Sequence, residues 1–335
     1  MKRITALFLT ILFLLSACGQ PSNSQSGGSQ SGSAQSEAQE HKISIVSTIF
    51  PGYDFARAVA GEHADLTMLL PPGAESHSYD PTPSDIITIQ NCAVFLYTGG
   101  ESDTWVDSVL ESMDTSNMTV ISMMELVDTV EEEIKAGMED DHSHDASISG
   151  SEGDHSGEEA EYDEHVWTSP VNAIRMTQAI ADTLCSLDGN NEDTYRANCA
   201  AYVEQLEGLD ASFREIVQNA QRDTLIFGDR FPFRYFVDEY GLDYYAAFPG
   251  CSSETEASAQ TVAFLIDKVQ EEKIPVVFYI EFSNEKMADT ICETTGAKKL
   301  LLHSCHNVTR DEFLGGMTYV ALMERNVAAL KEALS

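Results

Sequence analysis

The chain has 335 residues, of which 55 are Asp or Glu and 19 are Lys or Arg, so its formal net charge is −36 at pH 7. A surface this acidic repels nucleic acid and anionic lipid and attracts cations, which excludes a role in binding nucleic acid. The length beyond the first 40 residues exceeds one typical domain and favours two.

The N-terminus has the pattern of a secretory signal. Met1-Lys2-Arg3 precedes an apolar run, Ile4–Leu15, that is too short to span a bilayer as a helix. The following Ser16-Ala17-Cys18 completes a sequence that resembles a bacterial lipobox, which predicts removal of residues 1–17 and lipidation of Cys18. The alternative is ordinary cleavage that leaves a spare thiol. Residues 18–40 are rich in Ser, Gln and Gly, so we expect a flexible tether that anchors the body at the extracellular face of the cell membrane.

Residues 41–168 alternate short apolar strands with helical stretches and predict a first lobe. The predicted strands are Lys42–Ser47, Leu66–Leu70, Ala93–Tyr97 and Thr119–Met123. The predicted helices are Tyr53–Gly61, Pro83–Asn91 (with Thr82 as its N-cap) and Asp103–Glu111. Strands separated by helices indicate a parallel sheet that is covered on both faces.

An acidic segment interrupts this lobe. Residues 139–165 contain eleven Asp or Glu, four His and no Lys or Arg. Such a composition cannot bury enough apolar surface to offset its ordering entropy, so we expect residues 127–164 to form a disordered loop. Carboxylates interspersed with imidazoles favour loose binding of divalent cations; the simpler interpretation is a solvated, expendable loop.

Two long helices and a second lobe follow. Ser169-Pro170 begins a helix through Leu187, and a second helix covers Asn191–Ala220, so residues 169–221 predict a rigid connection. The strands predicted in residues 222–335 are Thr224–Phe227, Tyr244–Phe248, Pro275–Glu281 and Lys299–His303. The helices are Pro232–Tyr240, Ser258–Glu271, Asn284–Thr294 and a closing helix Asp311–Leu334. The predicted fold class is α/β, with two lobes, each a mostly parallel β-sheet flanked by helices, arranged as a clamshell.

Metal-competent side chains recur at the predicted strand ends, where parallel α/β sheets bind their ligands. The candidates from both lobes are His77, His165, Asp229, Glu281 and His303. Imidazoles with carboxylates suit zinc, whereas manganese or iron would take more oxygen ligands.

Each candidate also has a simpler interpretation. A single strand-end His is more often a surface or capping residue, Asp229 could pair with its neighbour Arg230, and Glu281 could cap the next helix. Cys305 and His306 lie so close to His303 that either imidazole or the thiol could face the site.

The six cysteines after Cys18 are too sparse for a disulfide framework, and we expect most to be buried free thiols. Cys251 and Cys305 both follow predicted strands and form the one pair to check. The chain contains no Gly-x-Ser-x-Gly, no Gly-rich phosphate loop and no His-Glu-x-x-His, so an enzyme is disfavoured.

Two motifs resemble the zinc- and manganese-binding lipoproteins of bacterial ABC importers. Pro71–Pro83 (PPGAESHSYDPTP) is similar to that family's first-ligand loop, and Asp163–Pro170 (DEHVWTSP) to its second-ligand segment, which follows a His- and acid-rich insertion in zinc-specific members. Further similarity lies in Ile49–Ala60, Gly296–Leu302 and Met317–Leu334. Together, the resemblance extends over nearly the whole body from His41 onward.

The resemblance implies that His77 and His165 are ligands, that Pro170–Leu187 is a long rigid helix between the lobes, and that the metal is passed to a membrane permease. The family usually has a His where this chain has Gly228-Asp229-Arg230, and often an acid where it has His303. We therefore predict an exchange in which His303 supplies the missing imidazole, with Asp229 or Glu281 as a carboxylate ligand.

The leading hypothesis is a lipid-anchored, monomeric Zn²⁺ receptor that serves an ABC importer permease. The acidic loop supplies His142, His144 and His155 as accessory metal ligands. Deleting residues 139–160 should remove weak zinc sites and spare the tight one. The alternatives are a Mn²⁺ or Fe²⁺ receptor of the same fold, a surface adhesin and a secreted metallohydrolase.

Overall fold

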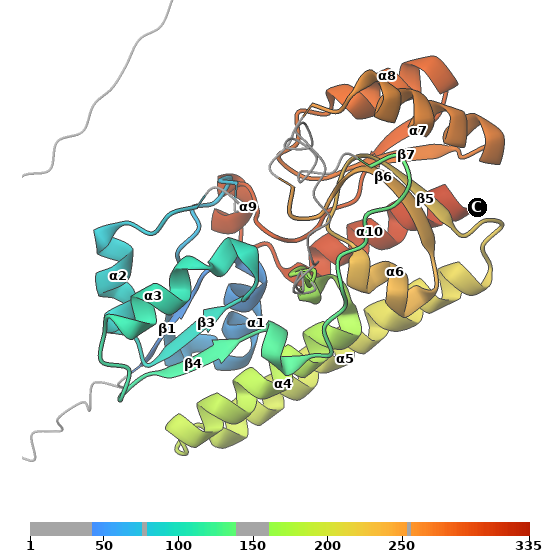
Figure 1. The fold of residues 1–335 in the computed structure, drawn as a ribbon. Coiled ribbons are helices and arrows are strands. Elements are labelled where there is room, and N and C mark those ends of the chain that lie inside the picture. Colours follow the sequence, from blue (N-terminus) through green and yellow to red (C-terminus); the bar gives the residue numbers. More distant parts are fainter. Residues whose placement is uncertain (1–41, 76–78, 139–160, 253–255) are drawn as a thin grey trace, which may run out of the picture. The chain divides into compact units, whose positions relative to one another are not determined.

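The computed structural model describes residues 42–75, 79–138, 161–252 and 256–335, which belong to one compact unit. This unit contains two parallel, four-stranded sheets with the same strand order (Figure 1). The first, β2-β1-β3-β4, consists of β1 Ile43–Ser47, β2 Ala64–Met68, β3 Val94–Tyr97 and β4 Thr119–Ser122. The second, β6-β5-β7-β8, consists of β5 Thr224–Phe231, β6 Asp243–Pro249, β7 Val276–Tyr279 and β8 Lys298–Leu301. The predicted fold class is confirmed.

Helices accompany each sheet, and two long helices separate the sheets in sequence. The α-helices are α1 Phe50–Ala60, α2 Pro83–Gln90, α3 Trp105–Glu111, α4 Pro170–Leu187, α5 Glu192–Gln218, α6 Arg234–Tyr240, α7 Ala259–Glu272, α8 Lys286–Thr295, α9 Arg310–Leu314 and α10 Tyr319–Leu334. The 3-10 turns are η1 Gly61–His63, η2 Glu101–Asp103, η3 Met124–Leu126 and η5 Val166–Thr168.

Two helices begin where the sequence predicts their caps. Thr82 accepts the backbone N–H of Asp85 at 3.3 Å, and the Asp85 carboxylate accepts the Thr82 N–H at 2.8 Å, which completes a capping box. Ser169 accepts the N–H of Asn172 at 3.4 Å at the start of α4. In both helices a proline follows the cap, where its missing N–H costs nothing.

One hydrophobic cluster runs through both sheets and the long helices. It joins Ile45 of β1, Met176 of α4, Leu206 of α5 and Phe278 of β7, and Trp167 lies fully buried in it. The helices α4 and α5 pack side by side, as Figure 1 shows, and α5 also contacts α1 and α10. Smaller clusters lie beneath α2 and α3 on one sheet and beneath α7 and α8 on the other.

The prediction of one closing helix, Asp311–Leu334, is wrong. Two helices occupy these residues, because α9 ends at Leu314 and α10 begins at Tyr319. Gly316 has φ +74°, a left-handed conformation that interrupts the helix and favours glycine. Thr318 then caps α10 by accepting the N–H of Ala321 at 3.1 Å.

The prediction of disorder across 127–164 is wrong at both ends of that range. Val127 and Val130 pack against the main core, and Val130 donates its N–H to the Tyr235 hydroxyl at 3.2 Å. Glu131 forms an isolated antiparallel bridge with Tyr162. These flanks are ordered because their apolar side chains pack against the core. Residues 139–160 lie outside the described residues.

All six cysteines after Cys18 are free thiols, and four of them are buried, which confirms the prediction. Cys251 and Cys305 form no disulfide. Among the helices that the structure describes, none combines the length and the apolar composition needed to cross a bilayer.

Candidate metal site

His165 lies buried between the loop flank and α4, with 1% of its surface exposed. Its Nδ1 lies 3.2 Å from Oδ1 of Asp163, which also accepts the His165 backbone N–H at 2.8 Å. Because a carboxylate only accepts hydrogen bonds, this contact places a proton on Nδ1, so that Nε2 carries the lone pair when the imidazole is neutral. Metal-binding histidines are typically oriented by such a carboxylate.

Carboxyl groups surround His165. Burial opposes protonation of its imidazole, but the carboxylates of Asp163, Glu164 and Glu132 more than offset this effect and raise the pKa of His165 above its usual value. Burial raises the pKa of the Glu164 carboxyl group, whose Oε2 accepts the Ser102 N–H at 2.9 Å. This concentration of negative charge favours a bound cation.

The second lobe brings His306 to His165. The two ring centroids are 5.6 Å apart, and the indole ring of Trp167 contacts both imidazoles. Trp167 is fixed because its Nε1 donates to the carbonyl of Ser304 at 2.8 Å. The chain reaches this position through a turn in which Cys305 has φ 63°, a left-handed conformation that is uncommon for a non-glycine residue.

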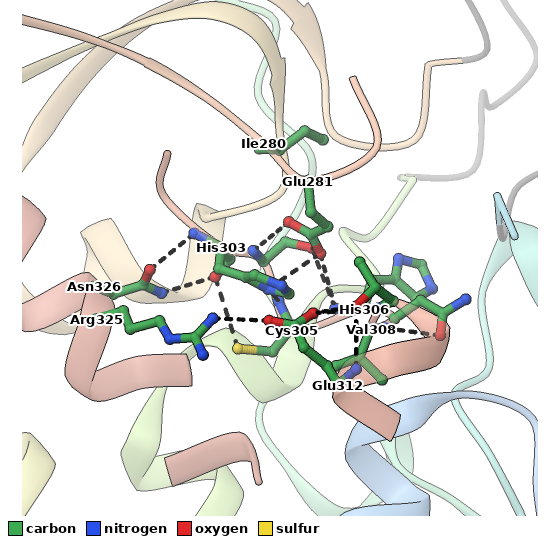
Figure 2. A network of polar contacts seen from close by, with 12 residues as sticks. Ile280, Glu281, His303, Cys305, His306, Val308, Glu312, Arg325 and Asn326 are labelled. Atoms are coloured by element: carbon green, nitrogen blue, oxygen red, sulfur yellow. Dashed lines mark hydrogen bonds and ion pairs between the residues drawn. The ribbon is translucent and has the colours of Figure 1, made fainter. Parts of the chain in front are cut away.

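Glu281 fixes this turn. Its Oε2 accepts the Ser304 N–H at 2.8 Å, and its Oε1 accepts the Ser304 hydroxyl at 2.6 Å and the His306 N–H at 3.3 Å (Figure 2). The carboxylate thus holds the backbone that carries His306. Phe282, the next residue, has φ 60°, which marks a second tight turn at the same place.

His303 lies in the protein interior rather than at the pocket. Its backbone N–H donates to Oδ1 of Asn326 at 2.8 Å, and Nδ2 of Asn326 donates to its carbonyl at 2.7 Å (Figure 2). Its Nδ1 accepts the N–H of Cys305 at 3.0 Å and lies 3.5 Å from Oε1 of Glu281. These contacts engage the imidazole in holding the turn.

Asp229 lies within β5, which continues to Phe231 through an irregularity between Phe227 and Arg230. Its Oδ1 accepts the N–H of Arg230 at 2.9 Å, and its Oδ2 accepts the N–H of Ile280 at 3.2 Å. Burial raises the pKa of Asp229. The prediction that β5 ends before this residue is wrong.

A small pocket collects residues from both lobes. Its volume is about 20 Å³, enough for one water-sized sphere or one metal ion. It is lined by Ala74, Glu75, His165, Arg230, Pro232, Gly250, Ile280, Glu281, Phe282, Ser304, His306 and Asn307. Two imidazoles and two carboxylates line this pocket, and these are ligand types that suit a borderline metal such as zinc.

The predicted site residues have different places in the structure. His165 and Glu281 line the pocket, whereas Asp229 and His303 do not. His77, the accessory His142, His144 and His155, and Cys18 lie outside the described residues. Within the described ranges, no three His, Cys, Asp or Glu side chains already stand at metal-binding spacing.

Sequence reasoning did not rank His306 above His303, although both were considered. It also missed Asp163 as the partner of His165 and the pairing of Arg230 with Glu75. The two-residue spacing of Asp163 and His165 was a usable signal, because one backbone turn brings such side chains together.

The two sheets, the helices joining them and the pocket lined from both lobes define a two-lobed solute-binding protein. More narrowly, the chain belongs to the ZnuA family, zinc-uptake complex component A, whose model matches residues 45–333. This is a family of transport binding proteins rather than of enzymes.

Relatives similar in sequence and in structure carry names that refer to zinc. The high-affinity zinc uptake system protein ZnuA of Bacillus subtilis is 30% identical over 335 residues, 99% of this chain and 98% of that protein. The zinc-binding lipoprotein AdcA of Streptococcus pneumoniae is 31% identical over 99% of this chain, but the chain spans only 61% of AdcA. The Zn(II)-bound ZnuA-like domain of AdcA is 29% identical, with a TM-score of 0.70 over 88% of this chain and 99% of that domain.

Proposed function

We propose that this protein is a Zn²⁺ receptor that captures the ion in the pocket between its lobes and delivers it to the permease of an ABC importer. The observation that carries this proposal is the pairing of His165 and His306 in an ion-sized pocket of a chain from a zinc-uptake family. The high-affinity zinc uptake relative, similar over its full length, supports the same cargo.

Within this proposal, His165 binds zinc through Nε2, and His306 and the Glu281 carboxylate bind from the second lobe. The contact of Asp163 with His165 Nδ1 supports the first assignment, and the ring contacts of His306 support the second. His77 completes the set on the strength of its sequence motif alone. His303 and Asp229 stay predictions as ligands. Unlike Glu281, neither lines the pocket, and their hydrogen bonds favour structural roles.

Zinc is preferred to manganese because the proposed set contains imidazoles, which suit zinc, rather than mainly oxygen ligands. Membership of a zinc-uptake family supports a receptor rather than an enzyme. We further propose a monomer anchored through a lipid on Cys18 and displayed outside the cell membrane. The name of the AdcA relative, a zinc-binding lipoprotein, supports the anchor.

A competition titration tests the cargo. Metal-free protein is titrated with zinc in the presence of a chromophoric chelator, and the titration is repeated with a large excess of manganese. We expect one tight zinc equivalent that manganese does not displace. Stronger binding of manganese than of zinc would replace this proposal with a manganese receptor, and no tight binding of either ion would reject both.

A further inference from the structure

Two side chains of the second lobe hold the loop of the first lobe that leads to the His77 motif. We propose that Arg230 and Asn307 are positioning residues that clasp loop Pro71–Glu75 at the pocket, and so slow the release of the captured ion. The effect on release rests on the proposed function, whereas the clasp itself does not.

Asn307 forms the first half of the clasp. The residue is 2% exposed, and its Nδ2 donates to the carbonyl of Pro71 at 2.8 Å and to the carbonyl of Ala74 at 2.9 Å. The loop itself is a tight turn in which Ala74 donates its N–H to Pro71 at 2.9 Å. The buried Asn307 amide therefore binds the carbonyls at both ends of this turn. Asn307 directly follows the pocket residue His306.

Arg230 forms the second half. Its Nη1 and Nη2 donate to Oε1 and Oε2 of Glu75, each at 3.1 Å, and Nη1 also lies 3.4 Å from the carbonyl of Ser252. Such bidentate pairs fix direction as well as distance, because the planar guanidinium matches a carboxylate. Both oxygens of Glu75 therefore face the guanidinium.

The chemistry of Arg230 suits a positioning role. It lines the pocket, yet a guanidinium only donates hydrogen bonds and cannot bind a metal ion. Its side chain is only 9% exposed, whereas the Glu75 side chain is 39% exposed. Water can therefore compete for Glu75, which makes this an ion pair that can open and close.

The clasp links ligand-bearing segments that are distant in sequence. Glu75 precedes His77 by two residues, and Asn307 follows His306 by one. A metal ion held by ligands from both segments is released when the segments separate, and separation requires the clasp to break. Loss of the clasp should therefore raise the dissociation rate more than it lowers the association rate.

The test compares R230Q, E75Q and N307A with the wild type in the full-length protein. Hydrogen exchange of the loop Pro71–Glu75 in metal-free protein measures the clasp, and zinc transfer to a chelator measures release. We expect faster exchange in all three variants and zinc release about tenfold faster, equivalent to about 1.4 kcal/mol. The association rate should stay within about threefold.

Three further variants sharpen the test. The double variant E75Q/R230Q should release zinc no faster than R230Q alone, because both changes break one interaction. R230K, which keeps the charge but not the planar fork, should be intermediate. R196Q removes an exposed arginine that pairs with Glu192 on α5 and should behave as wild type.

Unchanged loop exchange in R230Q and N307A would overturn the clasp, whatever the zinc affinity. Slower zinc release in R230Q would also overturn it, since Arg230 would then be withholding Glu75 from the metal. If the wild type binds no zinc, the proposed function fails, but the exchange measurement still decides whether the clasp exists.

Discussion

His303 and His306 show how much one turn decides at the scale of single residues. The two imidazoles are three positions apart and are chemically equivalent in the sequence. The left-handed conformation of Cys305 separates them, so that His306 lines the pocket while His303 supports the turn. No sequence pattern predicts a left-handed conformation at a cysteine. The structure was therefore needed to decide which of the two histidines lines the pocket.

The two histidines should therefore differ in their effect on zinc affinity. We expect H306A to weaken zinc binding by at least about 100-fold, beyond the about 10–100-fold that loss of an outer-shell partner costs. H303A should weaken it by no more than that outer-shell range, because its loss loosens the turn without removing a ligand. Chelator competition measures both. A larger loss in H303A than in H306A would instead support the exchange predicted from the sequence.

Asp103 gives a prediction about pH. Burial raises the pKa of its carboxyl from 3.8 to about 6, although the N–H groups of Thr98 and Gly99 partly oppose this. A raised pKa in the folded state means that this group's contribution to stability is full below pH 3.8 and is lost as the pH rises through about 6.

We accordingly expect D103N to gain stability relative to the wild type between pH 4 and pH 7, by at most about 3 kcal/mol. The amide oxygen can still accept the two backbone hydrogen bonds. Urea denaturation of metal-free protein at several pH values measures the difference. A stability difference that does not change with pH would show that Asp103 is not the titrating group.

At the scale of elements, most of the fold followed from the alternation of apolar runs with helical stretches. The strands and helices of both sheets lie within a few residues of their predicted positions. Thr82 and Ser169 cap the helices α2 and α4 as predicted. Sequence pattern failed where tertiary packing decides. Residues 127–138 read as part of an acidic loop, yet Val127 and Val130 pack against the core.

The break between α9 and α10 follows from one backbone conformation. Gly316 has φ +74°, and a Cβ added there would meet no atom within 4 Å, so the penalty of a side chain is purely conformational. We expect Gly316→Ala to lower the free energy of unfolding by about 1–2 kcal/mol.

Gly208, in the middle of α5, provides the matched control. A Cβ added there also meets no atom within 4 Å, but its helical backbone suits alanine. Gly208→Ala should therefore raise the free energy of unfolding by about 0.5–1 kcal/mol. Urea denaturation of both variants measures this contrast, and a neutral effect of Gly316→Ala would argue against the left-handed turn.

At the scale of the whole molecule, the continuous core bears on cooperativity. The main cluster includes Val94 of the first sheet, Phe227 of the second and Phe213 of α5, with Trp167 buried among them. Two sheets that share a core through the joining helices cannot lose it separately. We therefore expect metal-free protein to unfold in a single transition.

The two tryptophans make this prediction measurable. Trp105 packs in the small cluster of the first sheet, whereas Trp167 lies in the shared core. W167F leaves Trp105 as the reporter, and W105F leaves Trp167. In each variant the fluorescence midpoint in urea should coincide with the midpoint from circular dichroism, even though W167F lowers stability by removing the hydrogen bond to Ser304. If Trp105 changes at a lower urea concentration than the circular dichroism of the same variant, the first sheet unfolds on its own. The shared core would then fail to couple the two lobes.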